Sequence, residues 1–387
     1  MSDLTRRHVL AAAGAAPLVF AAGSALAQTA EGQPMPAGAA PQPAPPGERM
    51  GWAIVGLGSY GINQVIPGFA DARQSKMTAF VSGNPAKARD LGARHGVSRF
   101  YDYANYDTMK DNEAIDCVYI VLPVGLHAEY TIRALEAGKH VMCEKPMAST
   151  SAECEAMVAA ARANGRQLGI GYRVHFEPHN REALRRIKAG EIGAMRHIQC
   201  DHGFNASLDY PPHKWRLDKV LGGGGSMYDV GIYGINTSLM MLEGDRPKAV
   251  SAIYAYPRDD PRFAEVEGGI DWRMTMASGI NVLGSSSYCY SPYAARQRYF
   301  GADASIIMDP ATTYYDNALA IEGGGQPRRE IGAGNSREQF AAQLDGFSEA
   351  ARANRPHLTP GEMGLRDLRL MEAMYRSADA GGAVIEL

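Results

Sequence analysis

Short apolar runs alternate with helical segments between Gly51 and Asn164, and this alternation limits the fold more than any other feature. The runs are apolar throughout, which is typical of strands buried on both faces of a parallel sheet. Helical segments between such strands favour a doubly wound α/β domain. The expected strands cover residues 52–57, 77–81, 117–122 and 140–143, and the expected helices follow Gly61 and cover residues 85–95, 127–138 and 151–164.

The pattern changes after Gly171, where strand-like runs follow one another with few helices between them. This predicts an α+β domain with an open, mostly antiparallel sheet. We therefore expect a Rossmann domain over residues 50–170 and a substrate and oligomerisation domain over residues 171–387. The expected strands of the second domain are 196–200, 249–256, 270–276, 280–288 and 304–308, and two helices, 337–354 and 361–380, close the chain.

The N-terminus has the features of an export signal. Arg6 and Arg7 precede an Ala-rich apolar stretch, and Ala25-Leu26-Ala27 forms a small-x-small cleavage site. We expect residues 1–27 to be a twin-arginine signal peptide, which predicts a periplasmic protein exported in the folded state with its cofactor bound. A membrane anchor is the alternative, although the stretch is short for a permanent span. Residues 28–49 are rich in Pro and Ala and predict a linker or an extended arm.

Charge and cysteine usage exclude several kinds of partner. The net charge of -3 is spread over 387 residues without basic runs, which argues against nucleic-acid binding. The five cysteines form no C-x-x-C pair and have no histidine at zinc spacing, so we expect no metal site. They are expected to be buried thiols, with one disulfide as the alternative.

A glycine motif stands between the first expected strand and helix. Gly56-Leu57-Gly58-Ser59-Tyr60-Gly61 matches G-x-G-x-x-G in the strand-to-helix context that gives this motif its meaning. Gly56 permits a tight turn, Gly58 lets the backbone approach a pyrophosphate, and Gly61 allows the helix to pack closely on the strand. The motif predicts a dinucleotide-binding site.

The end of the second expected strand indicates which dinucleotide is bound. An NAD-selective site carries an acid about 20 residues past the glycines, where it accepts from the ribose 2'-hydroxyl. This chain has Ser82 there, followed by Gly83, Asn84 and Lys87. A hydroxyl, an amide, a helix N-terminus and an ammonium can all face a 2'-phosphate, so the sequence favours NADP. An ordinary turn with Lys87 in solvent is the alternative.

Two further segments carry groups suited to chemistry. Glu144-Lys145-Pro146 follows the strand expected at 140–143, and ligands of open parallel sheets lie beyond the carboxyl ends of the strands, so Lys145 is expected near the nicotinamide. Residues 222–242 join a glycine loop to an apolar helix in which Asp229 and Tyr233 stand four positions apart. A purely structural core helix is the alternative for this segment.

The whole set of motifs resembles the Gfo/Idh/MocA family of oxidoreductases, and within it the glucose-fructose oxidoreductases. The resemblance extends over nearly all of the chain after the expected arm. It rests on GLGSYGINQVIPGF from Gly56, VSGNPAKA from Val81, YDYANYD from Tyr101, VYIVLPVGLHAEY from Val118, AGKHVMCEKPMA from Ala137, IGYRVHFEP from Ile170, KWRL from Lys214, GGGSMYDVGIYGIN from Gly223 and MDPATTYY from Met308. Residues 204–213 do not match the substrate loop of those relatives.

The resemblance implies roles for individual residues. Tyr233 is implied as the proton acceptor, Asp229 as a hydrogen-bond partner of a substrate hydroxyl, and Lys145 as the group that positions sugar and nicotinamide. Because an ammonium favours a nearby phenolate, Lys145 and Tyr233 are expected to act together as the base. The implied cofactor-binding residues are Gly56, Leu57, Gly58, Ser59, Tyr60, Ser82, Gly83, Asn84, Lys87, Tyr103, Leu122, His127, Glu144, Lys145, Arg173, Trp215, Arg216 and Tyr315.

The implied activity is oxidation of an aldose at C1 to the lactone, with hydride passed through tightly bound NADP(H) to a second sugar carbonyl. The resemblance also implies a homo-oligomer, either dimer or tetramer, with small sugars as its partners and no stable membrane insertion. An NAD-dependent glycosidase of the same fold is the main alternative, but it would favour an acid near position 82 and a histidine in place of Tyr233. A non-catalytic sensor is disfavoured because both Lys145 and Tyr233 are present.

Overall fold

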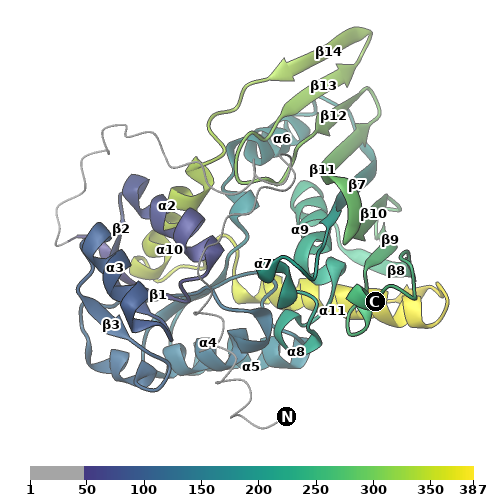
Figure 1. Cartoon of the computed structure of the whole chain (residues 1–387). Coiled ribbons are helices and arrows are strands. Elements are labelled where there is room, and N and C mark those ends of the chain that lie inside the picture. The colour runs from purple at the N-terminus through teal and green to yellow at the C-terminus, as the bar shows by residue number, and fades with distance from the viewer. Residues whose placement is uncertain (1–47) are drawn as a thin grey trace. The chain divides into compact units, whose positions relative to one another are not determined.

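The structure, a computed structural model, describes residues 48–387 (Figure 1). The predicted signal peptide and all but the last two residues of the predicted arm therefore lie outside the described residues. Contacts divide the described chain into two compact units. The first unit comprises residues 48–148, 152–171 and 340–364, and the second comprises residues 149–151, 172–339 and 365–387. Residues 340–364, which the sequence analysis assigned to the second domain, thus group with the first unit.

The first unit is built on a parallel sheet of six strands. Their order is β3-β2-β1-β4-β5-β6, and every neighbouring pair is parallel. This is the doubly wound order predicted from the sequence, and its direction reverses between β1 and β4, where such folds bind dinucleotides. The strands are β1 Met50–Val55, β2 Ser75–Val81, β3 Arg99–Tyr101, β4 Cys117–Ile120, β5 His140–Cys143 and β6 Leu168–Ile170.

Helix α3, Pro85–His95, shows how closely local sequence sets an element of this unit. The side chain of Asn84 caps the helix by accepting from the main-chain N–H of Lys87 at 3.0 Å. Proline at the first helical position has the right φ, and Gly96 ends the helix with φ +71°. The remaining helical segments are η1 Gly61–Val65, α2 Ile66–Asp71, η2 Tyr106–Asp111, η3 Val124–Leu126, α4 His127–Glu136 and α5 Ser151–Ala163.

Helix α10, Glu338–Arg352, explains why a late segment belongs to the first unit. Trp52 of β1 donates its indole N–H to Ser348 Oγ at 3.0 Å, and its ring lies 5.3 Å from that of Phe347. Asp345 accepts from the main-chain N–H groups of Arg73 and Gln74 at 2.6 and 2.8 Å, just ahead of β2. The core of the unit is therefore completed by residues far away in the sequence.

The second unit contains a sheet of nine strands in the order β14-β13-β12-β11-β7-β10-β9-β8-β15, which can be followed from β14 to β8 in Figure 1. Only the β7–β10 pair is parallel, so the predicted mostly antiparallel sheet is confirmed. The strands are β7 Met195–Asn205, β8 Pro247–Tyr254, β9 Gly269–Met276, β10 Asn281–Ser287, β11 Cys289–Gly301, β12 Ala304–Met308, β13 Leu319–Gly323, β14 Gln326–Ile331 and β15 Ile385–Glu386.

Helix α9, Ile232–Met241, packs closely on this sheet. A Cβ added at Gly234 would lie 2.7 Å from Cys200 Sγ on β7, and one added at Gly231 would lie 2.8 Å from Ser286 Oγ on β10. Larger residues would therefore push the helix away from the strands. The other helical segments are η4 Arg173–His175, α6 Pro178–Lys188, α7 Pro211–Lys214, α8 Lys219–Gly222, η5 Met227–Gly231, η6 Pro261–Phe263 and α11 Gly361–Asp379.

Three further observations bear on the expectations. Within residues 48–387, no helix is both long and apolar enough to cross a membrane. The same range contains no group of three or more His, Cys, Asp or Glu side chains arranged to hold a metal ion. All five cysteines are free thiols; four are buried and Cys289 is half-buried.

Candidate functional site

The three motif glycines of the first unit have three different surroundings. Gly56 has φ +99°, and an added Cβ would lie 2.2 Å from the main-chain oxygen of Val121, so only glycine fits this turn. An added Cβ at Gly61 would lie 2.8 Å from the oxygen of Gly56, which allows η1 to start close to β1. At Gly58 no atom lies within 4 Å of the added Cβ. The loop thus leaves open space at the glycine expected to face a pyrophosphate, and its residues fit a bound dinucleotide.

A corner of polar groups follows β2, beside this glycine loop. Ser82 is buried, and its Oγ accepts from the main-chain N–H of Asn84 at 3.1 Å. Lys87, in the first turn of α3, donates from Nζ to the main-chain oxygen of Leu57 at 3.2 Å. The structure therefore brings Ser82, Asn84, Lys87 and Leu57 together, with a helix N-terminus and an ammonium at one corner. Such a corner attracts a phosphate dianion.

The other predicted cofactor-binding residues near the glycine loop, and Tyr103 in the loop after β3, differ in their surroundings. Ser59 Oγ accepts from Asn63 Nδ2 at 3.1 Å, and Gly83 is exposed. The Tyr60 ring lies edge-on to Phe340 of α10 at 6.3 Å. Tyr103 packs edge-on to Tyr130 at 5.4 Å, and burial raises the pKa of Tyr103 above the ordinary tyrosine value.

His127 joins two loops at the carboxyl edge of the parallel sheet. Its Nε2 lies 2.8 Å from the oxygen of Leu122, and its Nδ1 lies 2.9 Å from the oxygen of Pro146, the residue after Lys145. Burial lowers the pKa of His127, and the charge of Lys145 adds to this effect. His127 therefore ties the loop after β4 to the loop that carries Lys145.

Glu144 also holds the loop that carries Lys145. Its Oε1 accepts from Tyr119 Oη at 2.5 Å, and its Oε2 accepts from the main-chain N–H of Lys145 at 3.2 Å. Tyr119 Oη in turn accepts from Gln343 Nε2 of α10 at 2.9 Å. Glu144 is buried, so these contacts hold the backbone of Lys145 in place. Lys145 itself is half-buried.

In the second unit, Tyr233 is held by a cation. Arg173 donates from Nη2 to Tyr233 Oη at 3.0 Å, and the guanidinium carbon lies 5.0 Å from the centre of the phenol ring. The imidazole of His202 on β7 stacks on the same ring, with centres 6.1 Å apart. Tyr233 is 8% exposed. This buried phenol therefore has an arginine at its oxygen, Arg173, which was expected from the sequence to contact the cofactor instead.

Asp229 forms an ion pair with Arg216 in the same unit. Its Oδ2 accepts from Arg216 Nε at 2.9 Å and from Tyr288 Oη at 3.2 Å. The guanidinium of Arg216 also lies 4.5 Å from the centre of the Trp215 ring. Asp229 lies in the π-helical turn η5 and Tyr233 in α9, so the two residues stand on either side of a change from π-helical to α-helical geometry. Such turns inside helices are frequent at functional sites.

Several residues near Tyr233 were missed by the sequence analysis. Partial desolvation raises the pKa of Tyr293, although 49% of this residue is exposed, and the nearby Tyr233 adds to the rise. Burial, again with Tyr233, also raises the pKa of Tyr314. Tyr293 lies within an irregularity in the pairing of β11 with β7, between Cys289 and Ala294, and an irregularity of this kind re-aims side chains. Nothing in the local sequence pattern signals such an irregularity.

The predicted residues thus form separate groups. Lys145 lies in the first unit, whereas Asp229, Tyr233, Arg173, Trp215 and Arg216 lie in the second, so the pairing of Lys145 with Tyr233 stays a prediction. Tyr315 is also in the second unit, but Arg337 stacks on its ring at 4.7 Å.

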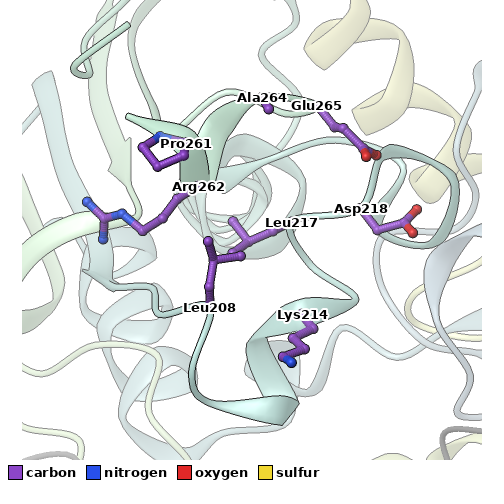
Figure 2. Close-up of a pocket in the computed structure, with 8 residues that line it drawn as sticks. All are labelled: Leu208, Lys214, Leu217, Asp218, Pro261, Arg262, Ala264 and Glu265. Atoms are coloured by element: carbon purple, nitrogen blue, oxygen red, sulfur yellow. The ribbon is translucent and has the colours of Figure 1, made fainter. Parts of the chain in front are cut away.

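A hollow of about 340 Å³ opens elsewhere on the second unit (Figure 2). Leu208 and Leu217 face its middle, whereas Arg262, Asp218 and Glu265 reach its margins (Figure 2). None of the predicted catalytic residues lines it. Its opposite charges give it no preference for an anion or a cation, and we assign it no role in catalysis.

Comparison with known proteins adds independent information. Residues 50–172 match the model of an oxidoreductase family with an NAD-binding Rossmann fold, and residues 180–307 match the GFO/IDH/MocA C-terminal domain. An aldose-aldose oxidoreductase from Caulobacter crescentus, solved with glycerol, is 40% identical, with a TM-score of 0.83 over 88% of this chain and 100% of that one.

Two other relatives differ in the cofactor that their names give. A D-xylose 1-dehydrogenase [NADP(+)] from Haloarcula marismortui is 28% identical over 86% of this chain and 92% of its own length. An inositol dehydrogenase homologue from Azotobacter vinelandii, solved with NAD+, is 25% identical, with a TM-score of 0.77 over 88% of this chain and 98% of its own. Cofactor choice therefore varies among relatives, and local residues must decide it.

Proposed function

This chain belongs to the GFO/IDH/MocA family of oxidoreductases, and from that premise we propose that it is an NADP-dependent sugar oxidoreductase. It oxidises an aldose at C1 to the lactone and returns hydride to the carbonyl of a second sugar. The observation that carries the proposal is the polar corner after β2. There the ammonium of Lys87 reaches the glycine loop, and Ser82 occupies the position where an acid would select NAD.

The cofactor is NADP(H). The backbone at Gly58, which leaves room, would hold the pyrophosphate, and Ser82, Asn84 and Lys87 would hold the 2'-phosphate. A carboxylate at position 82 would repel that phosphate, and this chain has none there. The name of the D-xylose dehydrogenase relative agrees with this choice.

The protein's own groups manage the proton. Tyr233 Oη takes the proton of the anomeric hydroxyl while the C1–H bond breaks, and NADP+ supplies the acceptor for the hydride. Asp229, oriented by Arg216 and Tyr288, accepts a hydrogen bond from another hydroxyl of the sugar. Lys145, held by Glu144 and by the loop that His127 fixes, orients the substrate. In the return half-reaction Tyr233 gives its proton to the carbonyl oxygen of the second sugar.

The sugar pair is of the aldose-aldose or the glucose-fructose type. The 40% identity to the aldose-aldose enzyme supports an aldose donor. The segment 204–213 differs from the substrate loop of glucose-fructose oxidoreductases, so this loop does not identify the acceptor sugar. Both types need a cofactor that stays bound between the two half-reactions.

Location and assembly belong to the same proposal. The protein is exported folded to the periplasm by the twin-arginine signal at residues 1–27, without stable membrane insertion, and forms a homo-oligomer. Fractionation of cells that express the full chain tests the location, with Arg6→Lys and Arg7→Lys together as the control for the signal. Light scattering of the purified protein tests the assembly, and a monomer would contradict it.

Product analysis tests the reaction itself. The purified full chain is incubated with one aldose, or with glucose and fructose, without added nucleotide. We expect a lactone or its aldonic acid together with an equal amount of a sugar alcohol, and NADP(H) in the denatured supernatant. Release of a free sugar from a glycoside would favour the glycosidase alternative, and no product with any sugar would contradict the proposal.

A further inference from the structure

We infer that Arg173 is the cationic partner that holds Tyr233 in position and stabilises negative charge on its oxygen. The inference rests on the proposed function, in which Tyr233 exchanges a proton with sugar hydroxyls. It assigns to Arg173 a role at the phenol instead of the cofactor contact expected from the sequence. The two residues lie 60 positions apart, on η4 and α9 of the second unit.

The contacts of the guanidinium hold it in one orientation. Its Nη1 donates to the main-chain oxygen of Thr313 at 3.1 Å and to Gln339 Oε1 at 2.6 Å. Its Nη2 donates to the main-chain oxygen of Thr312 at 2.6 Å and to Tyr233 Oη at 3.0 Å. Arg173 is 2% exposed. A planar fork fixed at three neutral acceptors presents the second N–H of Nη2 to the phenol in a single geometry.

Two aromatic rings flank the same guanidinium. Its central carbon lies 5.0 Å from the centre of the Tyr233 ring and 4.5 Å from the centre of the Tyr314 ring. Ring faces attract a cation, so both tyrosines help to retain the buried charge.

The direction of the hydrogen bond has a chemical consequence. Arginine stays protonated and can only donate, so Tyr233 Oη must accept from Arg173 in every state of the phenol. The phenol hydrogen consequently points away from Arg173, where it can reach a substrate oxygen. When Tyr233 loses that proton, the bond from Arg173 becomes charge-assisted and strengthens. The arrangement stabilises the state that accepts a proton from the sugar.

Other ionisable groups also face Tyr233 within the second unit. They are His202 on β7, Tyr293 on β11 and Tyr314 in the loop after β12. His202 contacts Thr312 Oγ1 through Nε2 at 3.1 Å. His202, Tyr293 and Tyr314 carry no permanent positive charge, whereas Arg173 does. The pH dependence of the rate can therefore separate the contribution of Arg173 from theirs.

The test compares Arg173→Gln and Arg173→Lys with the unchanged full chain. Arg173→Gln removes the charge, and Arg173→Lys keeps a charge but loses the planar fork. Arg262→Gln is the matched control, because Arg262 is also multiply bonded in the second unit, to Asp260, Asn205 Oδ1 and the oxygen of Ala206, but does not contact Tyr233. Thermal melting of all three variants records any general loss of stability.

We expect Arg173→Gln to lower kcat roughly 100-fold near neutral pH, the usual effect of losing one donor at a developing oxyanion. Part of the rate should return at alkaline pH, because the rising limb of the pH profile should move to higher pH. Arg173→Lys should be intermediate, and Arg262→Gln should leave the limb in place. An Arg173→Gln enzyme whose rate falls equally at every pH would overturn the inference.

A second readout does not depend on any sugar. Ultraviolet titration detects tyrosinate, and subtracting the curve of Tyr233→Phe isolates Tyr233 from the other tyrosines among the 19 in the chain. The isolated signal should appear at higher pH when Arg173→Gln is introduced. An unchanged signal contradicts the inference even if the enzyme is active. A displaced signal in a protein that oxidises no sugar supports the inference and contradicts the proposed function.

Discussion

The ammonium of Lys87 lies 3.2 Å from the main-chain oxygen of Leu57, so a positive charge from the first turn of α3 lies at the glycine loop. Two segments of the cofactor motif, separated by the whole of β2, therefore meet at one corner. The ammonium donates here to an uncharged carbonyl, and a phosphate would be a stronger partner for it.

Replacing Lys87 by methionine tests this corner. Lys87→Met keeps the length of the side chain but removes its charge, so we expect NADP binding to weaken about tenfold and NAD binding to change little. Fluorescence titration of the reduced cofactors measures both. Lys110→Met, at an exposed site of the first unit, is the control. Equal losses for NAD and NADP would show that Lys87 does not face the 2'-phosphate.

Ser82→Asp should change the choice of cofactor. The new carboxylate repels a 2'-phosphate and can accept from a ribose 2'-hydroxyl, so the ratio of NADP to NAD affinity should fall by about tenfold or more. Competition titrations give the ratio, with Ser82→Ala as the matched variant that adds no charge. An unchanged preference in Ser82→Asp would move the recognition site elsewhere.

Two glycines of one loop should respond in different ways to the same added methyl group. At Gly58 the methyl enters open space, so Gly58→Ala should fold with a near-normal Tm but bind nucleotide poorly. At Gly56 it would lie 2.2 Å from the oxygen of Val121 on a backbone with φ +99°, so Gly56→Ala should lower the Tm of the apoprotein. Calorimetry with and without NADP measures both effects. The same response at both positions would contradict the assignment of pyrophosphate to Gly58.

Tyr233→Phe should remove the proton acceptor but leave the fold intact. We expect kcat to fall roughly 10²- to 10⁴-fold, the range for a positioned acid-base group. Steady-state kinetics and circular dichroism measure rate and fold. Tyr254→Phe, which loses a hydroxyl bonded to Asp379 at an exposed site, serves as the control. Near-normal turnover by Tyr233→Phe would assign the proton to another group.

Stability should fall with acid in a defined window. Burial lowers the pKa of His175 to about 4 from the ordinary 6.5, despite its hydrogen bond with Asn236. Between these values the unfolded chain takes up a proton that the folded protein refuses, so stability declines as pH falls from 6.5 to 4, by up to about 1.4 kcal/mol per unit for one group.

His175→Gln should remove the contribution of His175 to this acid-dependent loss of stability. Urea unfolding across the window should give a shallower loss of stability than in the unchanged protein, measured from each protein's own value near about pH 8. Burial also lowers the pKa of His140 and His213 to about 4, so a residual slope remains. Identical slopes in the two proteins would mean that His175 does not contribute.

The bounds of strands and helices were predicted most accurately where local chemistry determines the structure. Strand β5 and helix α3 match their expected bounds because buried apolar runs and caps such as Asn84 act within a few residues. Strand β14 was missed because an edge strand needs few apolar residues, and every residue of β14 is exposed or half-buried. Strand β13, which lies between β14 and β12, was missed as well. Residues 340–364 were placed in the second domain, whereas the structure groups them with the first unit. Their contacts with Trp52 and Gln74 join segments almost a whole chain apart, so no local pattern reports them.

The sequence indicated which residues belong to the candidate site better than it indicated which of them contact one another. Gly56, Gly58, Ser82 and Lys87 act close to their position in the chain, and the structure brings them together as expected. The hydrogen bond of Arg173 to Tyr233 joins two distant elements, and no spacing rule reports it. The aim of Tyr293 depends on a strand irregularity that also has no local signature.

The place of α10 sets an order of events during synthesis. Leu344, Phe347 and Ala351 are part of the core that contains Trp52, and Asp345 holds the start of β2. The half of the protein made first on the ribosome must wait, incompletely packed, for a helix translated nearly three hundred residues after β1 begins. A nascent chain cut short before that helix would expose the Trp52 cluster to water, and would be a target for chaperones or proteases before any nucleotide could be retained.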